Sequence, residues 1–147
     1  AIYRKILSLN PDLKDFQEKL DASVYEKSEE LRKKGNRLQN DKKPFAAIRA
    51  YKESISTYSS NQKAKANLSQ AISQERQKLS VYMNQGKNSY KKRKYDSAIE
   101  IFSNILLIDP SNKAANGYLY NAKLKRDALK RLLECNQQNT DCSLWKK

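Results

Sequence analysis

The side chains best suited to chemistry in this sequence are cations. Lysine and arginine number 30 against 16 aspartates and glutamates, which gives a formal charge of +14, a balance that favours acidic partners. The sequence has no histidine, the side chain that most often moves protons near neutral pH and one of the main zinc ligands. Its glycines are isolated, so they form no phosphate-binding loop. We therefore expect a binding protein, with neither enzymatic activity nor a cofactor.

The two cysteines, Cys135 and Cys142, enclose a polar segment. Nothing else in the sequence could complete a four-ligand metal site around them, so we expect no metal. A disulfide that closes a short loop is the economical interpretation. It would indicate an exported protein, in a bacterial periplasm or another extracytoplasmic compartment. Two reduced thiols in a cytoplasmic protein are the alternative.

The elements that must position these residues repeat along the chain. The segment ILSLNPD at residues 6–12 returns as ILLIDPS at residues 105–111. Four small, aromatic and helix-ending positions also recur, each 51 residues later: Gly35, Ala47, Tyr51 and Ser59, then Gly86, Ala98, Phe102 and Pro110. With three glycines and three prolines in all, the sequence favours long helices over a sheet with many turns.

Apolar residues with helical spacing predict helices over residues 12–41, 44–58, 62–92, 95–108 and 112–134. Leu13, Phe16 and Leu20 begin one apolar stripe, which continues toward Leu38. We expect residues 62–92 to form one continuous helix beside residues 12–41. The alternative is that residues 62–78 form a separate short helix or a frayed one.

The segment from Tyr82 to Asn112 resembles the tetratricopeptide repeat (TPR) family, whose signature combines aromatic-x2-Leu-Gly-x2-Tyr with Ala-x3-aromatic and Pro. Gln85 and Ser89 depart from this signature, and the period of 51 exceeds the usual 34. The resemblance implies an all-α, right-handed α-solenoid of antiparallel hairpins with extended first helices. Its parts would be the end of a preceding repeat (1–11), two extended units (12–61 and 62–112), a capping helix (113–134) and a tail (135–147), so we expect upstream sequence to have been cut away.

In TPR proteins, ligands lie in a concave groove lined by the first helix of each hairpin. By resemblance, the partner-binding residues here are Arg32, Asn36, Asn84, Lys87, Tyr90 and Lys91. Three of them match part of a carboxylate clamp that some members use. Ala114 and Tyr118 stand where its other basic residues would be, so coincidence is the simpler explanation of the match.

Stacked hairpins would also align their turns into a basic ridge. The ridge residues are Lys42, Lys43, Lys91, Lys92, Arg93, Lys94, Lys125 and Arg126. One interpretation is a surface that binds an anionic polymer. The other is that cations simply favour the C-terminal ends of helices, where the helix dipole is negative.

The sequence thus favours a scaffold or adaptor that presents a basic concave surface to a protein partner, itself acidic. The alternative is a binder of an anionic polymer, nucleic acid or cell-wall glycan, through the basic ridge. Nucleic acid is disfavoured because no base-reading module is recognised, although Tyr90 and Tyr95 could stack on bases. No window of the sequence is apolar enough for a transmembrane segment.

Overall fold

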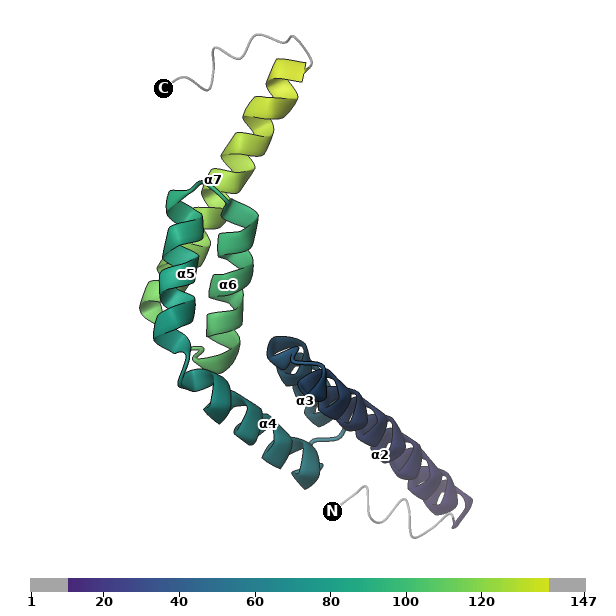
Figure 1. The fold of residues 1–147 in the computed structure, drawn as a ribbon. Helices are drawn as coiled ribbons and strands as arrows, with labels where there is room; N and C mark the ends of the chain where they lie inside the picture. Colours follow the sequence, from purple (N-terminus) through teal and green to yellow (C-terminus); the bar gives the residue numbers. More distant parts are fainter. Residues whose placement is uncertain (1–10, 138–147) are drawn as a thin grey trace. The chain divides into compact units, whose positions relative to one another are not determined.

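The structure, a computed structural model, describes residues 11–137 (Figure 1). Every regular element within this range is an α-helix, which confirms the all-α class. The helices are α2 (Pro11–Asn40), α3 (Pro44–Thr57), α4 (Gln62–Arg76), α5 (Leu79–Lys91), α6 (Tyr95–Ile108) and α7 (Lys113–Gln137). They divide into two compact units, and each is described by itself: unit 1 ends at Gln74 and unit 2 begins at Glu75.

In unit 1, α2 and α3 form an antiparallel hairpin. Gly35 of α2 lies against the ring of Tyr51, while Ser28, two turns earlier, bonds to Ser54, one turn later in α3. A Cβ at Gly35 would overlap the Tyr51 ring, so the residue must be glycine for the helices to approach this closely. Burial of Ala47, Ile48 and Tyr51 forms the apolar contact between the helices.

A polar cluster joins this hairpin to α4. The hydroxyls of Ser28 and Ser54 each donate to the other residue's carbonyl oxygen, at 2.8 and 2.7 Å. Asn61 donates to the Ser28 hydroxyl at 2.9 Å, and its side-chain oxygen accepts the N–H of Ala64 at 3.0 Å. Asn61 is therefore the N-cap of α4, and it fixes where α4 begins beside α2.

In unit 2, α6 packs antiparallel against both α5 and α7. Phe102 of α6 lies beside Gly86 of α5 and stacks on Tyr118 of α7, with ring centroids 5.1 Å apart. Ala98, Ile105, Ala115 and Ala122 complete its buried core. Small residues thus let the helices approach, and one aromatic ring fills the space between them.

The two units repeat each other in structure as well as in sequence. Gly35 and Gly86 meet the rings of Tyr51 and Phe102, all at the 51-residue offset. Asn112 caps α7 through the N–H of Ala115 at 3.0 Å, as Asn61 caps α4. Because caps and close approaches recur at equivalent positions, the repeat found in the sequence describes the fold within each unit.

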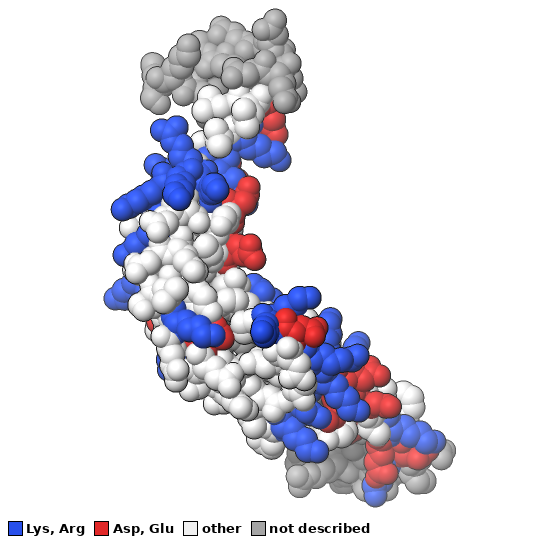
Figure 2. Space-filling view, viewed as in Figure 1, with Lys and Arg blue, Asp and Glu red and all other residues white. Residues whose placement is uncertain are grey.

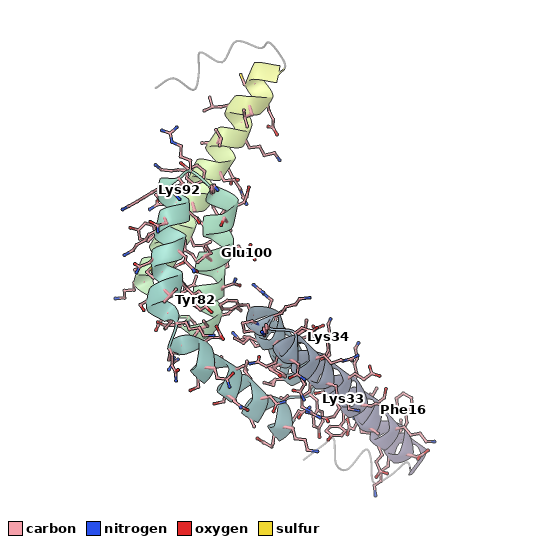
Figure 3. All side chains as sticks on the ribbon, viewed as in Figure 1. Phe16, Lys33, Lys34, Tyr82, Lys92 and Glu100 are labelled. Atoms are coloured by element: carbon pink, nitrogen blue, oxygen red, sulfur yellow. The ribbon has the colours of Figure 1, made fainter. Side chains whose placement is uncertain are left out.

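The prediction of one continuous helix over residues 62–92 is wrong. α4 ends at Arg76 and α5 begins at Leu79. Glu75 lies at the break with 3% of its surface exposed. Its carboxylate accepts bonds from the Lys78 ammonium, at 2.9 Å, and from the Tyr82 hydroxyl, so the turn brings two donors to the buried carboxylate. Tyr82 lies in the first turn of α5 (Figure 3).

The apolar stripe predicted for α2 is buried only in part. Leu13, Phe16 and Leu20 are 42%, 65% and 46% exposed, because α3 covers only the C-terminal half of α2. Phe16 projects from the early part of this helix (Figure 3). Among the described helices, none is both long enough and apolar enough to span a membrane.

Candidate partner-binding site

Unit 1 contains a pocket of about 320 Å³ where α4 runs beside α2. Side-chain carboxamides dominate its wall, together with one phenol and one methyl group. The lining residues are Asn36, Gln39, Asn40, Tyr51, Asn67, Gln70, Ala71 and Gln74. None of these side chains carries a formal charge at neutral pH, so the pocket is suited to a neutral polar ligand.

Hydrogen bonds between helices hold the amide pocket in shape. Asn36 accepts from the Tyr51 hydroxyl at 2.9 Å and from the Asn67 amide at 2.7 Å. Near the other end, Gln39 donates to Gln74 at 2.9 Å. The two α2–α4 pairs run in the same order along both helices, so the helices run in the same direction.

One acceptor in this pocket has no partner. The Gln39 side-chain oxygen is buried and forms no hydrogen bond in the part of the chain that the structure describes. An unsatisfied buried acceptor costs about 1–3 kcal/mol. Because the oxygen is buried, a ligand donor would reach it, and remove that cost, only after the Gln39 carboxamide turned toward the pocket.

The corresponding positions in unit 2 hold no such pocket. The equivalents of Asn36, Gln39 and Asn67 are Lys87, Tyr90 and Tyr118. The Tyr90 and Tyr118 rings meet edge to face at 5.5 Å, and the Lys87 ammonium lies 5.9 Å from the Tyr118 ring centre. Aromatic packing fills the space, so the two predicted groove residues here, Lys87 and Tyr90, contribute to packing in unit 2.

Arg32, predicted to contact a partner, is held by its own helix. Its guanidinium forms two hydrogen bonds of 2.9 Å with Glu29, and both side chains are about 15% exposed. These bonds from Arg32 lower the pKa of Glu29 to about 2, and a bond from Asn61 contributes too. The pKa of Arg32 is raised in turn by the hydrogen bond to Glu29. The donors of the Arg32 guanidinium are therefore engaged at least in part by Glu29 of the same helix.

The remaining predicted groove residues do not gather at the amide pocket. Asn36 lines it, whereas Asn84 and Lys91 are exposed side chains of α5 in the other unit. Sequence reasoning missed Asn67, Gln70 and Gln74, because α4 was interpreted as an extension of a first helix. Their signal was present as three amides at i, i+3 and i+7, a spacing that places them on one helix face.

The ridge residues of unit 2 gather around the turn from α5 to α6. Lys91, Lys92, Arg93 and Lys94 are exposed there, and Figure 2 shows Lys and Arg side chains clustered at this end of α5. Lys125 of α7 places its ammonium 5.6 Å from the centre of the Tyr90 ring. Arg126 instead pairs with Asp127 at 2.7 Å. Lys42 and Lys43 occupy the corresponding turn of unit 1.

The predicted cysteine pair is only half within the described range. Cys135 lies in the last turns of α7, whereas Cys142 lies outside the described residues, so the disulfide stays a prediction. Over residues 11–137, no group of three or more histidine, cysteine, aspartate or glutamate side chains is arranged to hold a metal ion.

Comparisons with models of protein families, with curated proteins and with solved structures found no match to this chain. The site must therefore be interpreted from its own geometry.

Proposed function

We propose that this chain is a non-enzymatic scaffold or adaptor that binds an extended segment of a partner protein in the amide pocket between α2 and α4. In this proposal the hairpins belong to a TPR-like, right-handed α-solenoid. The observation that carries the proposal is the pocket itself, a neutral, amide-lined space with one buried acceptor, the Gln39 oxygen, left without a donor.

Side-chain carboxamides suit this ligand because each offers both a donor and an acceptor, as a peptide group does. An extended main chain could bond to amides on both walls at once, with one of its N–H groups supplied to Gln39. Outside the pocket, the charge of +14 would attract a partner with acidic flanking residues and accelerate its association. The partner's main chain would supply most of the affinity, and the positive charge around the pocket would supply a preference for segments with acidic flanks.

A displayed library of unstructured 12-residue peptides tests the proposal. Peptides selected on the wild-type protein are measured by calorimetry against the variant Gln70→Leu, which removes a carboxamide from the pocket wall. We expect its affinity to fall about tenfold, the effect of losing one hydrogen bond. Gln62→Leu is the matched control, since Gln62 is an exposed glutamine of the same helix outside the pocket. Equal affinity of the two variants would contradict the proposal.

A second candidate function is binding of an anionic polymer by the basic cluster at the α5–α6 turn. It is favoured because Lys91, Lys92, Arg93 and Lys94 are exposed and form no ion pair with any described acidic residue. A salt titration separates the two functions. The logarithm of the affinity for a phosphate polymer falls linearly with the logarithm of salt concentration, whereas binding of an uncharged peptide by the neutral amides should change little.

The proposed place of action is extracytoplasmic, such as a bacterial periplasm, and it rests on the predicted Cys135–Cys142 disulfide. Mass spectrometry of non-reduced protein from its native compartment should show the loss of two hydrogens. Two thiols that alkylate freely would assign the scaffold to the cytoplasm.

A further inference from the structure

The outer side of α7 carries an exposed apolar ridge. Tyr120, Leu124 and Leu132 are 64%, 52% and 46% exposed, and Ala128 lies between the last two. The four-residue spacing places these side chains next to one another along the helix. Ala115 and Ala122, by contrast, point into the core of unit 2. We call this surface the α7 ridge; it comprises Tyr120, Leu124, Ala128 and Leu132. It is a second apolar surface of α7, in addition to the one that packs in the core of unit 2.

The repeat does not explain this ridge. At the positions equivalent to Tyr120, Leu124 and Ala128 the chain has the polar residues Ser69 and Ser73 in α4 and Gln77 just after it, while the equivalent of Leu132 is Val81. In α2 the equivalents of Tyr120 and Ala128 are Glu18 and Glu26. An unbroken run of four apolar residues at this register is therefore particular to α7 among the three copies, and packing within unit 2 does not require it.

Gly117 adds a second, independent observation one turn before Tyr120. It is exposed, and a Cβ built there would meet no atom within 4 Å. Unlike Gly35 and Gly86, it makes no room for a neighbour within its own unit. A glycine that weakens a helix without serving internal packing is suited to the close approach of an external one.

The charges of α7 indicate what that external helix should be. The helix has six cations: Lys113, Lys123, Lys125, Arg126, Lys130 and Arg131. Its two acids are engaged within the helix, Asp127 with Arg126 at 2.7 Å and Glu134 with Lys130 at 3.8 Å. A second copy of α7 would bring like charges together, which disfavours self-association. An acidic partner would offset the excess of positive charge on this helix.

We propose that the α7 ridge docks an acidic amphipathic helix of another protein. The apolar face of that helix would cover Tyr120 and Leu124, its backbone would approach over Gly117, and its acidic flanks would meet the surrounding lysines and arginines. The site lies in unit 2 and is separate from the amide pocket of unit 1.

A displayed library of 20-residue amphipathic helices tests this assignment. Each member has leucines at i, i+4 and i+7 and flanking positions varied among Glu, Gln, Ser and Lys. We expect selection on the wild-type protein to enrich Glu flanks. Affinity should then fall about tenfold or more in Leu124→Glu, which places a charge at the centre of the contact, and in Gly117→Leu, which blocks the approach.

The matched control is Val81→Glu, because Val81 of α5 has the same 52% exposure as Leu124. This control and the pocket variant Gln70→Leu should leave binding of the selected helices unchanged. Loss of peptide binding in the amide pocket can therefore be distinguished from loss of helix binding at the α7 ridge. Any of three results would overturn the assignment: no enrichment, enrichment of neutral or basic flanks, or selected helices that ignore Leu124→Glu.

Two further measurements identify other occupants of the ridge. Co-sedimentation with phosphatidylglycerol vesicles that Leu124→Glu abolishes would identify a membrane surface. A concentration-dependent dimer in sedimentation velocity that the same change abolishes would identify a second copy of the chain. Either result would overturn the acidic-helix assignment, and we expect neither.

Discussion

Lys42 and Arg93 occupy the same position in the two units and share a backbone φ of 58°. Lys42 follows α2 and Arg93 follows α5, and each ends its helix with a Schellman motif. In these motifs the Lys43 N–H donates to the Leu38 carbonyl oxygen and the Lys94 N–H donates to the Ser89 carbonyl oxygen. Glycine is the usual residue at this left-handed position because side chains with a Cβ are strained there. Lys42 and Arg93 at these left-handed positions therefore lower the free energy of unfolding, and they keep both turns basic.

Replacing either cation with glycine should therefore stabilise the protein. We expect Arg93→Gly to raise the free energy of unfolding by about 1 kcal/mol through relief of the left-handed strain. Lys92→Gly is the control, because it removes the same charge at a residue with φ of −78° and should be neutral or destabilising. Urea denaturation measures both, and equal effects would contradict a backbone origin.

Gly86 and Gly117 should respond oppositely to alanine. A Cβ at Gly86 would lie 2.7 Å from the Phe102 ring, so Gly86→Ala should destabilise by about 1–3 kcal/mol despite its better helix propensity. Gly117→Ala meets open space and should stabilise by about 0.5–1 kcal/mol. Thermal unfolding checks both, and Phe102→Leu in the Gly86→Ala background should recover part of the loss. A stabilising Gly86→Ala would show that the helices can separate without cost.

Much of this fold could be predicted from the sequence, since glycine, alanine and aromatic positions recur with one offset. The break between α4 and α5 was only the alternative interpretation, a separate short helix over residues 62–78. The segments equivalent to residues 77–78 remain helical in α2 and α7, so the repeat itself favoured continuity. The break accompanies the burial of Glu75 and its bonds with Lys78 and Tyr82, which are tertiary contacts that helical periodicity does not encode.

The candidate site was predicted less well than the fold. The family resemblance directed attention to charged groove residues, but Arg32 is paired internally with Glu29 and Lys87 lies over the Tyr118 ring. Of the predicted groove residues, Asn36 alone lines the amide pocket. Equivalent positions form a pocket in unit 1 and a packed cluster in unit 2 because their side chains differ in size. Unit 1 has the amides of Gln39 and Asn67 there, and unit 2 has the rings of Tyr90 and Tyr118. The alignment of the two units at the 51-residue offset already contained this difference.

The two N-caps should differ in their contribution to stability. Asn112→Ala removes one capping bond and should cost about 1 kcal/mol. Asn61→Ala also removes the Asn61 donor to the Ser28 hydroxyl and one of the donors to Glu29, at a residue that is 2% exposed, so we expect about 2–3 kcal/mol. Guanidinium denaturation of both variants measures the difference. Equal losses would mean that the polar cluster contributes nothing beyond the cap.

The ion pair between Glu29 and Arg32 should make stability depend on pH in a defined interval. The pKa of Glu29 is lowered from 4.5 to about 2 in the folded protein, chiefly by the bonds from Arg32. A depressed pKa stabilises the fold above the unfolded value, and the contribution is lost as pH falls from about 4.5 to about 2. We expect Glu29→Gln to lower the free energy of unfolding at pH 7 by on the order of 1–3 kcal/mol. This deficit should shrink as the pH falls through the same interval, because the wild-type carboxylate becomes protonated.

Glu30→Gln, which removes the same charge at the exposed next residue, should show no comparable deficit. Urea denaturation of the three proteins between pH 7 and pH 2 measures the effect, and a deficit that stays constant over this range would show that the ion pair is not its source.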